Sequence, residues 1–340
     1  MPPSSVIFIP EIHTARFEKG RLHMYREQIK VLDCTIRDGG LMNNHAFDES
    51  FVREVFKAIS QAGIDYMEIG YKNSRRLFDD KKYGPWKFCD DETIRRVTEG
   101  IESRTKISVM VDVDRVDMDE IKPKKDSPVS MIRTACYAKD VDKAIHMANC
   151  FVDKGYEATV NLMAVSKVLE VELMECFEQL EKECRAQVIY LVDSNGALYQ
   201  ETVEYLVKKA QSIIRSKEIG IHAHNNQQLA FGNTIEAIIH GANYLDSTLY
   251  GMGRAAGNCP TELLLGFLKN PKFNIRPVLD VIAKKMVPLS KEVEWGYVIP
   301  YAITGILDEH PKAALDIRKT DKKDHYREFY DSLGGTSNLD

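Results

Sequence analysis

Short apolar segments alternate along most of the chain with longer segments in which apolar residues recur at helical spacing. Eight of the short segments are bounded by turn or helix-capping residues, which is the pattern of buried strands. They cover residues 30–35, 65–69, 107–112, 130–135, 158–162, 188–192, 219–224 and 244–249. Each segment is followed by room for one helix, so the pattern predicts consecutive strand–helix units.

The clearest helical pattern lies between the first two predicted strands. In residues 51–62 the apolar side chains form one stripe, and Gly63 supplies a helix stop. Similar helical patterns cover residues 141–154, 202–214 and 235–239. Eight strand–helix units within about 240 residues predict a closed parallel (β/α)₈ barrel, the TIM-barrel architecture of the α/β class.

The main alternative is a doubly wound open sheet that binds a dinucleotide. That fold needs a glycine-rich turn directly after its first strand. The first predicted strand is followed by Arg-Asp-Gly-Gly at residues 37–40, which lacks the required spacing. The glycine-rich segment 251–258 (GMGRAAGN) comes after the last strand, so a nucleotide-phosphate loop is disfavoured.

The alternation of strands and helices stops after residue 262. Helical patterns follow at residues 261–268, 278–286 and 302–315, and residues 318–327 are highly charged. We expect the last residues, 334–340, to fray. The sequence therefore predicts an N-terminal extension (1–27), a barrel domain (28–268) and a C-terminal helical region with a frayed tail (269–340), which forms an appendage to the barrel.

Composition excludes several classes of function. The formal net charge is -5 and the pI is about 6.0, so the chain has no general attraction to nucleic acid or anionic lipid. No segment approaches the roughly 18 apolar residues of a membrane span, and the N-terminus lacks the pattern of a signal peptide. The seven cysteines form no CxxC pair, which indicates reduced thiols. We expect a cytoplasmic protein without nucleic-acid or membrane partners.

Four metal-binding side chains follow predicted strands that closure of a barrel would bring together. Asp38 follows the first strand, and His222 and His224 end the seventh, where their spacing places both on one face. Asn258 follows the eighth strand, which neighbours the first in a closed barrel. Two imidazoles, a carboxylate and an amide oxygen suit Mn²⁺, Mg²⁺, Zn²⁺ or Fe²⁺. The alternative interpretation is a hydrogen-bonded histidine pair with a structural role.

Other polar residues at strand ends are candidates for substrate contacts. Arg37 offers a fork of donors to a carboxylate or to an enolate oxygen, although a structural ion pair is the alternative. Glu68 ends the second predicted strand. Its carboxylate would pair with Arg37 or hold a water molecule in the outer shell of the metal. Asn161, Ser194 and Asn195 would orient substrate oxygens or cap the following helices.

Five ordered motifs together resemble the DRE-TIM metallolyase superfamily. They are DCTIRDGG at 33–40, MEIG at 67–70, VDSNG at 192–196, HAHNN at 222–226 and GMGRAAGN at 251–258. This superfamily contains 3-hydroxy-3-methylglutaryl-CoA lyase, 4-hydroxy-2-oxovalerate aldolase, isopropylmalate and homocitrate synthases and carboxyltransferase domains. The resemblance covers about residues 28–268 and implies a barrel that binds a divalent metal.

Within the superfamily, the chain is most similar to the 4-hydroxy-2-oxoacid aldolases, through its Arg-Asp-Gly opening and its ending at 251–262. This resemblance implies a class II aldolase in which Asp38, His222 and His224 bind the metal, Mn²⁺ being the first expectation. It further implies that Arg37 stabilises the enolate of pyruvate. Asn258 matches a position that is a metal ligand or lies near the metal in the lyase branch.

One departure from the aldolase pattern concerns the catalytic acid/base. The aldolases have Ser-His after Arg-Asp-Gly, whereas this chain has Gly40-Leu41. His45 is the first substitute, with a loop histidine as the alternative interpretation. The aldolases also use a tyrosine from the C-terminal region, for which Tyr297 is the first candidate and Tyr301 the second.

The sequence therefore predicts a metal-dependent carbon–carbon lyase that cleaves or forms 4-hydroxy-2-oxo acids from a 2-oxo acid and an aldehyde. An acyl-CoA-dependent Claisen enzyme of the isopropylmalate or homocitrate synthase type and a noncatalytic metal-binding subunit remain alternatives. We expect a homo-oligomer. The resemblance also implies an aldehyde dehydrogenase partner. The altered loop after Asp38 argues against this partnership.

Overall fold

The computed structural model describes residues 16–18, 21–23 and 26–334 of the chain. Strands β1 (Arg16–Glu18) and β2 (Arg21–His23) pair in antiparallel fashion. The rest of the predicted N-terminal extension up to residue 25, and the predicted tail beyond residue 334, lie outside the described residues.

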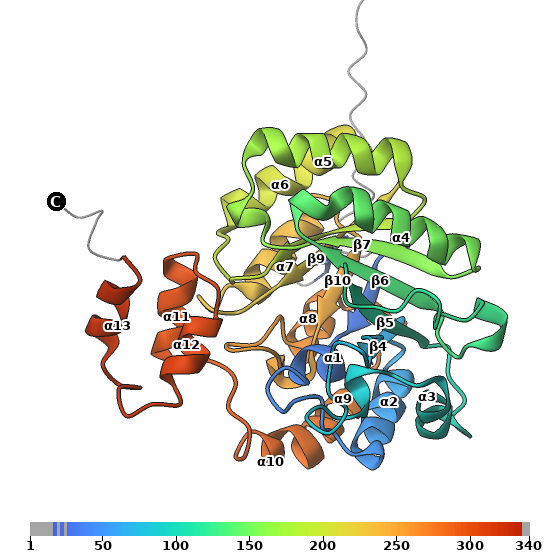
Figure 1. Ribbon diagram of the computed structural model, residues 1–340, viewed down its shortest axis with the longest axis horizontal. Helices are drawn as coiled ribbons and strands as arrows, with labels where there is room; N and C mark the ends of the chain where they lie inside the picture. Colours follow the sequence, from blue (N-terminus) through green and yellow to red (C-terminus); the bar gives the residue numbers. More distant parts are fainter. Residues whose placement is uncertain (1–15, 19–20, 24–25, 335–340) are drawn as a thin grey trace, which may run out of the picture.

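Eight parallel strands form a closed barrel in the order β10-β3-β4-β5-β6-β7-β8-β9 (Figure 1). They are β3 (Lys30–Asp33), β4 (Tyr66–Tyr71), β5 (Lys106–Asp112), β6 (Met131–Cys136), β7 (Glu157–Leu162), β8 (Val188–Asp193), β9 (Glu218–Ala223) and β10 (Tyr244–Ser247). Each predicted strand overlaps one of them. The predicted TIM barrel is thus confirmed.

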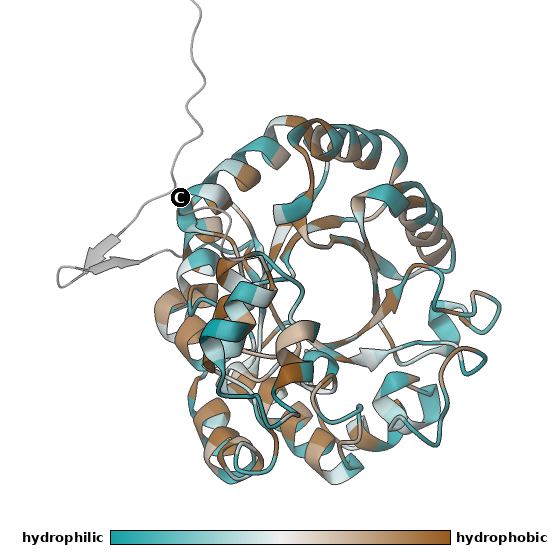
Figure 2. Ribbon diagram, turned by 60° about the vertical axis from the view of Figure 1, so that its left-hand side comes forward, coloured by the Kyte–Doolittle hydropathy of each residue, from teal (hydrophilic) through white to brown (hydrophobic). Residues whose placement is uncertain are grey.

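A ring of helices covers the outside of the barrel (Figure 2). It consists of α2 (Glu49–Ala62), α3 (Asp91–Thr98), α4 (Val141–Asp153), α5 (Glu170–Glu183), α6 (Gln200–Ile213), α7 (Ala230–Ile239) and α8 (Thr261–Leu268). Every residue of β4, β6 and β8 is buried, because the barrel interior covers one face of each strand and the helices cover the other.

Local sequence sets both ends of α2. The Asp48 carboxylate accepts a hydrogen bond from the backbone N–H of Phe51 at 2.7 Å, which caps the first turn. Gly63 ends the helix with a φ of 75°, a conformation that favours glycine. A Cβ atom at Gly63 would also lie 2.4 Å from the Lys272 carbonyl oxygen. Gly63 thus allows the segment after α8 to pack against the barrel.

The first part of the C-terminal region belongs to the main apolar core. Helix α9 (Arg276–Val281) continues through a π-helical turn (Ile282–Met286) into α10 (Val287–Leu289) and contacts α2. Val278 and Met286 are buried in the same apolar cluster as the helices around the barrel. This segment therefore packs as part of the barrel.

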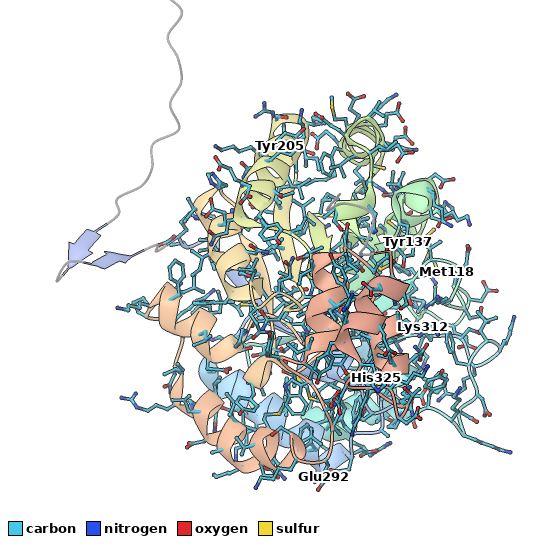
Figure 3. All side chains as sticks on the ribbon, turned by 90° about the vertical axis from the view of Figure 1, so that its left-hand side faces the viewer. Met118, Tyr137, Tyr205, Glu292, Lys312 and His325 are labelled. Carbon is cyan, nitrogen blue, oxygen red and sulfur yellow. The ribbon has the colours of Figure 1, made fainter. Side chains whose placement is uncertain are left out.

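The remaining helices form a separate cap. Helices α11 (Ile299–Ile306), α12 (Lys312–Ile317) and α13 (Tyr326–Ser332) pack around a second apolar cluster that includes Tyr301 and Phe329. Figure 3 looks onto this cap, in which Lys312 and His325 are labelled. The cap lies over the end of the barrel at which the strands have their carboxyl ends.

The single helix predicted over residues 302–315 is wrong, because a turn separates α11 from α12. Asp308 in this turn has a φ of 52°, which ends α11. Pro311 lacks an N–H group and disfavours helical geometry at the residue before it. The turn brings Asp308, Glu309 and His310 to the mouth of the barrel, where they contact residues of the barrel loops.

All seven cysteines are free thiols, and only Cys150 among them is not fully buried. Burial raises the pKa of the Cys34 and Cys136 thiols, so neither is poised as a nucleophile. Of the helices in residues 26–334, none combines the length and the apolar character that crossing a membrane requires.

Candidate active site

A cavity of about 460 Å³ opens at the carboxyl end of the barrel, where TIM barrels carry their functional loops. Side chains from opposite sides of the barrel line it, and they include Arg37, Asp38, Tyr71, His222, His224 and Arg254. The turn between α11 and α12 contributes Glu309 and His310 to the lining. The cavity thus lies between the barrel and the C-terminal cap.

A short helix, α1 (Thr35–Gly39), positions Arg37 and Asp38 directly after β3. The helix is wholly buried, and Gly39 packs closely against Met252 of the loop after β10. A Cβ atom at Gly39 would lie 2.8 Å from the Met252 sulfur, so glycine permits this approach. This contact therefore holds α1 against the loop after β10, and both segments carry a predicted metal ligand.

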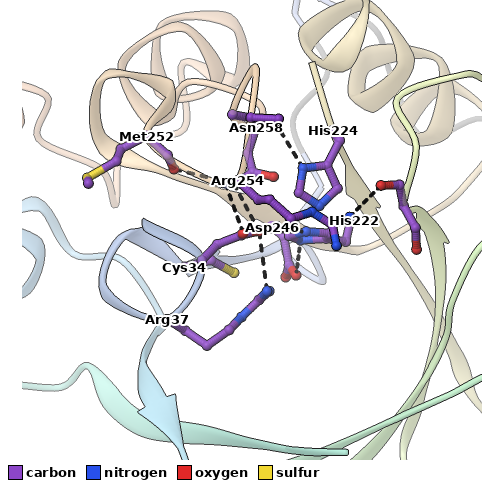
Figure 4. Close-up of polar contacts among 12 residues, drawn as sticks. Cys34, Arg37, His222, His224, Asp246, Met252, Arg254 and Asn258 are labelled. Atoms are coloured by element: carbon purple, nitrogen blue, oxygen red, sulfur yellow. Dashed lines mark hydrogen bonds and ion pairs between the residues drawn. The ribbon is translucent and has the colours of Figure 1, made fainter. Parts of the chain in front are cut away.

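Asp38, His222 and His224 converge as predicted. Figure 4 shows the two imidazoles beside Arg254 and Asn258. The Asp38 Oδ2 atom lies 3.2 Å from His222 Nε2 and 3.7 Å from His224 Nε2. The other ring nitrogens point away, His222 Nδ1 to the Asp246 carboxylate at 2.9 Å and His224 Nδ1 to the Gly257 carbonyl oxygen at 3.2 Å. These acceptors hold the Nδ1–H protons, which leaves both Nε2 lone pairs for a metal.

Asn258 completes this group from the loop after β10. Its amide nitrogen lies 3.1 Å from Asp38 Oδ2 and 3.3 Å from the Met252 carbonyl oxygen, and it donates to both. Its Oδ1 atom is buried and has no hydrogen-bond partner among the described residues. A buried amide oxygen without a donor fits a cation or a cation-bound water molecule.

The charges around these residues also fit a divalent cation. Burial alone would raise the pKa of Asp38, but Arg37 and the two imidazoles lower this pKa well below its ordinary value. Asp38 is therefore ionised. With neutral imidazoles, the three carboxylates Asp38, Glu68 and Asp246 exceed by one negative charge the two guanidinium groups that contact them, those of Arg37 and Arg133. A divalent ion would neutralise this charge and leave the site attractive to an anionic substrate.

A chain of buried ion pairs crosses the barrel interior beneath these residues. Arg37 Nε lies 2.6 Å from Glu68 Oε2, and Arg133 Nη1 lies 3.1 Å from the same oxygen. Arg133 Nη2 lies 2.6 Å from Asp246 Oδ2, which also accepts the His222 proton. The chain fixes the orientation of Arg37 at one end and of His222 at the other.

Sequence reasoning missed two members of this chain, Arg133 and Asp246. Arg133 has no exposed surface, and its guanidinium lies 4.3 Å from the centre of the Tyr190 ring. Gly220 makes room for that ring, because a Cβ atom there would lie 2.6 Å from it. The signal in the sequence is a single charged residue within each of two otherwise uncharged strands.

The predicted polar residues at the carboxyl ends of β7 and β8 also lie at the cavity. Asn161, Ser194 and Asn195 line it. The Ser194 hydroxyl accepts a hydrogen bond from the backbone N–H of Ala164 at 2.9 Å. The Asn195 amide donates to Asp308 at 2.8 Å, so this side chain fastens the C-terminal turn to the barrel. Among the three, Asn161 is the one whose amide nitrogen is buried without a partner.

The predicted acid/base residues lie elsewhere. His45 is 1% exposed, and its ring packs edge-on against Tyr71, with 5.4 Å between ring centres. Burial lowers the pKa of His45 to about 3. Tyr297 is 60% exposed, and neither residue lines the cavity. Tyr301 is buried in the cap, where its hydroxyl donates to Glu294 at 2.9 Å.

Gly40 and Leu41 explain this arrangement. A Cβ atom at Gly40 would lie 2.2 Å from the His45 ring, so the glycine gives the buried histidine its space. Leu41 lines the cavity at the place where the aldolase pattern has its histidine, and it offers only an apolar contact. Glu68 is buried beneath Arg37 and does not line the cavity.

Comparison with known proteins places the chain in a family. A family model described as HMGL-like matches residues 28–284. The chain is 29% identical over 263 residues to the 4-hydroxy-2-oxovalerate aldolase of Thermus thermophilus, an alignment that covers 76% of this chain and 75% of the relative. It is 28% identical over 249 residues to the oxaloacetate decarboxylase of Mycobacterium tuberculosis, covering 72% and 71% of the two chains.

Solved structures agree with this placement. The N-terminal domain of an aldolase candidate from Bacteroides vulgatus superposes with a TM-score of 0.74 at 28% identity, covering 87% of this chain and 98% of that domain. The family model spans the whole barrel, including α1 with Asp38, β9 with His222 and the loop with Asn258. The chain therefore belongs to the HMGL-like family.

Proposed function

We propose that the protein is a divalent-metal-dependent aldolase that cleaves or forms 4-hydroxy-2-oxo acids through the enolate of pyruvate. The observation that carries this proposal is the convergence of Asp38, His222 and His224 beside the Arg37 guanidinium in one cavity. The similarity to 4-hydroxy-2-oxovalerate aldolases supports the choice of reaction. The substrates would be a 2-oxo acid and an aldehyde.

Asp38, His222 and His224 would hold the metal, with the Asn258 oxygen beside them. Mn²⁺ is our first choice, and Mg²⁺, Zn²⁺ and Fe²⁺ suit the same donor set. A bound divalent ion supplies Lewis acidity toward the carboxylate and the 2-oxo oxygen of the substrate. Asp246 and the Gly257 carbonyl keep the imidazoles in the tautomer that metal binding requires.

Arg37 would stabilise the negative charge that develops on the 2-oxo oxygen. Its Nε and Nη1 atoms contact Glu68 and Asp38, whereas Nη2 makes no hydrogen bond with the described residues. Arg37 lines the cavity, so this third nitrogen is free to donate to a substrate oxygen. During cleavage the electron pair of the breaking C3–C4 bond moves toward that oxygen, and the aldehyde is released.

We propose that Tyr71, at the end of β4, handles the proton of the 4-hydroxyl group. Tyr71 lines the cavity, and its hydroxyl makes no hydrogen bond with the described residues. Burial raises its pKa, so the hydroxyl stays protonated at neutral pH and is suited to donate a proton to the forming alcohol during synthesis. His45 would hold the Tyr71 ring in place through the edge-on contact of the two rings.

The test of the proposed function uses purified protein loaded with Mn²⁺. We expect metal-dependent exchange of the methyl protons of pyruvate with solvent, followed by formation of a 4-hydroxy-2-oxo acid when an aldehyde is added. The product mass identifies the reaction. Turnover of an acyl-CoA ester instead would favour an acyl-CoA-dependent Claisen enzyme. Release of CO₂ from oxaloacetate would favour a decarboxylase. Absence of all three would indicate a noncatalytic metal-binding protein.

Arg37→Lys is expected to lower turnover by about 10²–10³-fold, the scale of losing one oxyanion donor. The lysine keeps the positive charge but loses the planar fork that reaches Glu68, Asp38 and the substrate together. Because no guanidinium binds a cation, the metal content of the variant should stay at the wild-type level. Wild-type turnover in this variant would remove Arg37 from the mechanism.

Tyr71→Phe is expected to lower aldol formation, the direction in which the protonated hydroxyl donates, by roughly 10²-fold, at the lower end of general acid–base effects. His45→Gln is expected to have a smaller effect, since His45 has no surface in the cavity. The rate of aldol formation reports on the proton of the new alcohol, and the rate of pyruvate exchange reports on the methyl protons, so both rates are measured for both variants. A larger loss in His45→Gln than in Tyr71→Phe would return the acid/base role to His45.

A further inference from the structure

Arg254 presents a guanidinium group to the cavity without a carboxylate to neutralise it. Its Nη2 atom donates to the Ser194 carbonyl oxygen at 2.6 Å, which fixes the side chain across the mouth of the barrel. Within residues 26–334, no carboxylate oxygen lies within 4.0 Å of its nitrogens. Its backbone N–H donates to Asp38 Oδ1 at 3.2 Å, so Arg254 is a direct neighbour of the candidate metal site.

His310, from the turn between α11 and α12, faces this guanidinium. The Nη1 atom of Arg254 lies 3.3 Å from His310 Nε2. The other ring nitrogen, Nδ1, accepts a hydrogen bond from the backbone N–H of Lys312 at 3.1 Å. A neutral imidazole whose Nδ1 accepts a hydrogen bond carries its proton on Nε2. Two N–H groups therefore point toward each other, and each lacks an acceptor.

The ionisation of His310 agrees with this geometry. Partial burial and the neighbouring Arg254 and Lys312 lower the pKa of His310, and Glu309 opposes this effect only in part. The imidazole is thus neutral at pH 7 and cannot form an ion pair of its own. An anionic oxygen that bridges the two nitrogens from the side of the cavity would accept from both of them and would neutralise the guanidinium.

Most of the carboxylates that line the same cavity already have cationic partners. Asp38 contacts Arg37 at 3.2 Å, Asp112 contacts Arg115 at 3.2 Å, and Glu309 contacts Lys167 at 3.3 Å. Glu172 and Lys139, both of which line the cavity, have no ion pair among the described residues, and their charges offset each other. The unneutralised positive charge of the inner cavity therefore lies on Arg254.

We propose that Arg254 and His310 bind an anionic group on the half of the substrate that does not contact the metal. The aldehyde would then carry a carboxylate or a phosphate. This inference rests on the proposed function, which places the 2-oxo acid at Asp38, His222 and His224. The cavity of about 460 Å³ has room for both halves, and its two sites are joined through the Arg254 backbone. Arg254 would select the aldehyde and would not take part in bond cleavage.

The experiment compares two pairs of aldehydes with Mn²⁺-loaded protein and pyruvate. Succinic semialdehyde is compared with butanal, and D-glyceraldehyde 3-phosphate with D-glyceraldehyde. We expect kcat/KM to favour the anionic member of at least one pair by about 10²-fold, which also tells a carboxylate from a phosphate. In Arg254→Gln this preference should fall by roughly 10²-fold, the scale of a charge-assisted contact, and Arg254→Lys should restore part of it.

Further variants keep the test decisive. His310→Leu removes one donor from an exposed turn, where unfolding of the barrel is not a concern, and should lower the preference by about 10-fold. Arg215→Gln removes an exposed positive charge before β9, at the opposite end of the barrel, and should leave the preference unchanged. Equal kcat/KM for both members of both pairs in the wild type would overturn the proposal, as would an unchanged preference in Arg254→Gln and His310→Leu.

Failure of the proposed function gives a different result. Pyruvate proton exchange without an aldehyde reports on the metal and Arg37 alone, so its absence would refute the aldolase and not the anion site. Calorimetric titration of the Mn²⁺-loaded protein with the same aldehyde pairs, in the absence of pyruvate, then tests the anion site by itself. Tighter binding of an anionic aldehyde that Arg254→Gln weakens supports the site, and equal binding within both pairs overturns it.

Discussion

Replacement of both His222 and His224 by alanine is expected to abolish stoichiometric binding of a divalent metal, and with it pyruvate exchange and carbon–carbon cleavage. The change removes two of the three Nε2 and carboxylate donors that lie within 4.8 Å of one another and leaves Asp38 with the Asn258 amide. Elemental analysis of the protein after gel filtration measures the metal content. Activity should fall to background, since the remaining donors cannot fix a cation against solvent.

The matched control removes two imidazoles from outside the cavity. His146 on α4 and His325 before α13 are both exposed, so His146→Ala combined with His325→Ala should keep full metal content and activity. Thermal unfolding of both double variants shows whether the barrel persists. Full metal content in the His222→Ala, His224→Ala variant would mean that the metal binds elsewhere, and the proposed site would have to be abandoned.

The barrel was predictable because its signal is local and repeated. Each strand is a short apolar segment between turn residues, and eight repetitions leave few other topologies. The convergence of the candidate ligands followed from one further rule, that strand ends meet at one face of a barrel. His222 and His224 share a face through their spacing alone, and Asp38 joins them because β3 and β10 close the ring. None of these steps required knowledge of side-chain packing.

The C-terminal cap was less predictable, since its geometry depends on contacts that span much of the chain. The apolar pattern of residues 302–315 is helical throughout, and only Pro311 signals the break between α11 and α12. That break places His310 beside Arg254, which lies 56 residues earlier in the sequence. A pattern that repeats every few residues contains no information about such a pairing.

His45 shows why residue type alone does not assign a catalytic role. Its ordinary pKa suits proton transfer at neutral pH, and its position after Asp38 suggested the cavity. The ring instead turns into the space above Gly40 and packs against Tyr71. Burial then removes the property that made histidine attractive, because it lowers the pKa to about 3. The direction of a side chain in a loop is set by packing.

The buried ion pairs were difficult to predict for a different reason. A charged residue in a strand indicates an exposed position unless its partner is known. Arg133 and Asp246 lie 113 residues apart, and neither is acceptable inside the barrel without the other. With Arg37 and Glu68 they form one chain of alternating charge that ends at the His222 imidazole. The chain therefore links the stability of the barrel interior to the orientation of a candidate metal ligand.

Arg133→Met is expected to lower the free energy of unfolding by about 3–5 kcal/mol, since it leaves Glu68 and Asp246 buried without their shared cation. Urea denaturation of the metal-free protein measures the change without a contribution from metal binding. The same substitution at Arg96, whose ion pair with Glu49 is exposed, should leave the free energy of unfolding nearly unchanged. Equal stability of the two variants would show that the buried chain does not stabilise the barrel. Its remaining role would then be to orient His222, which metal affinity in Arg133→Met measures separately.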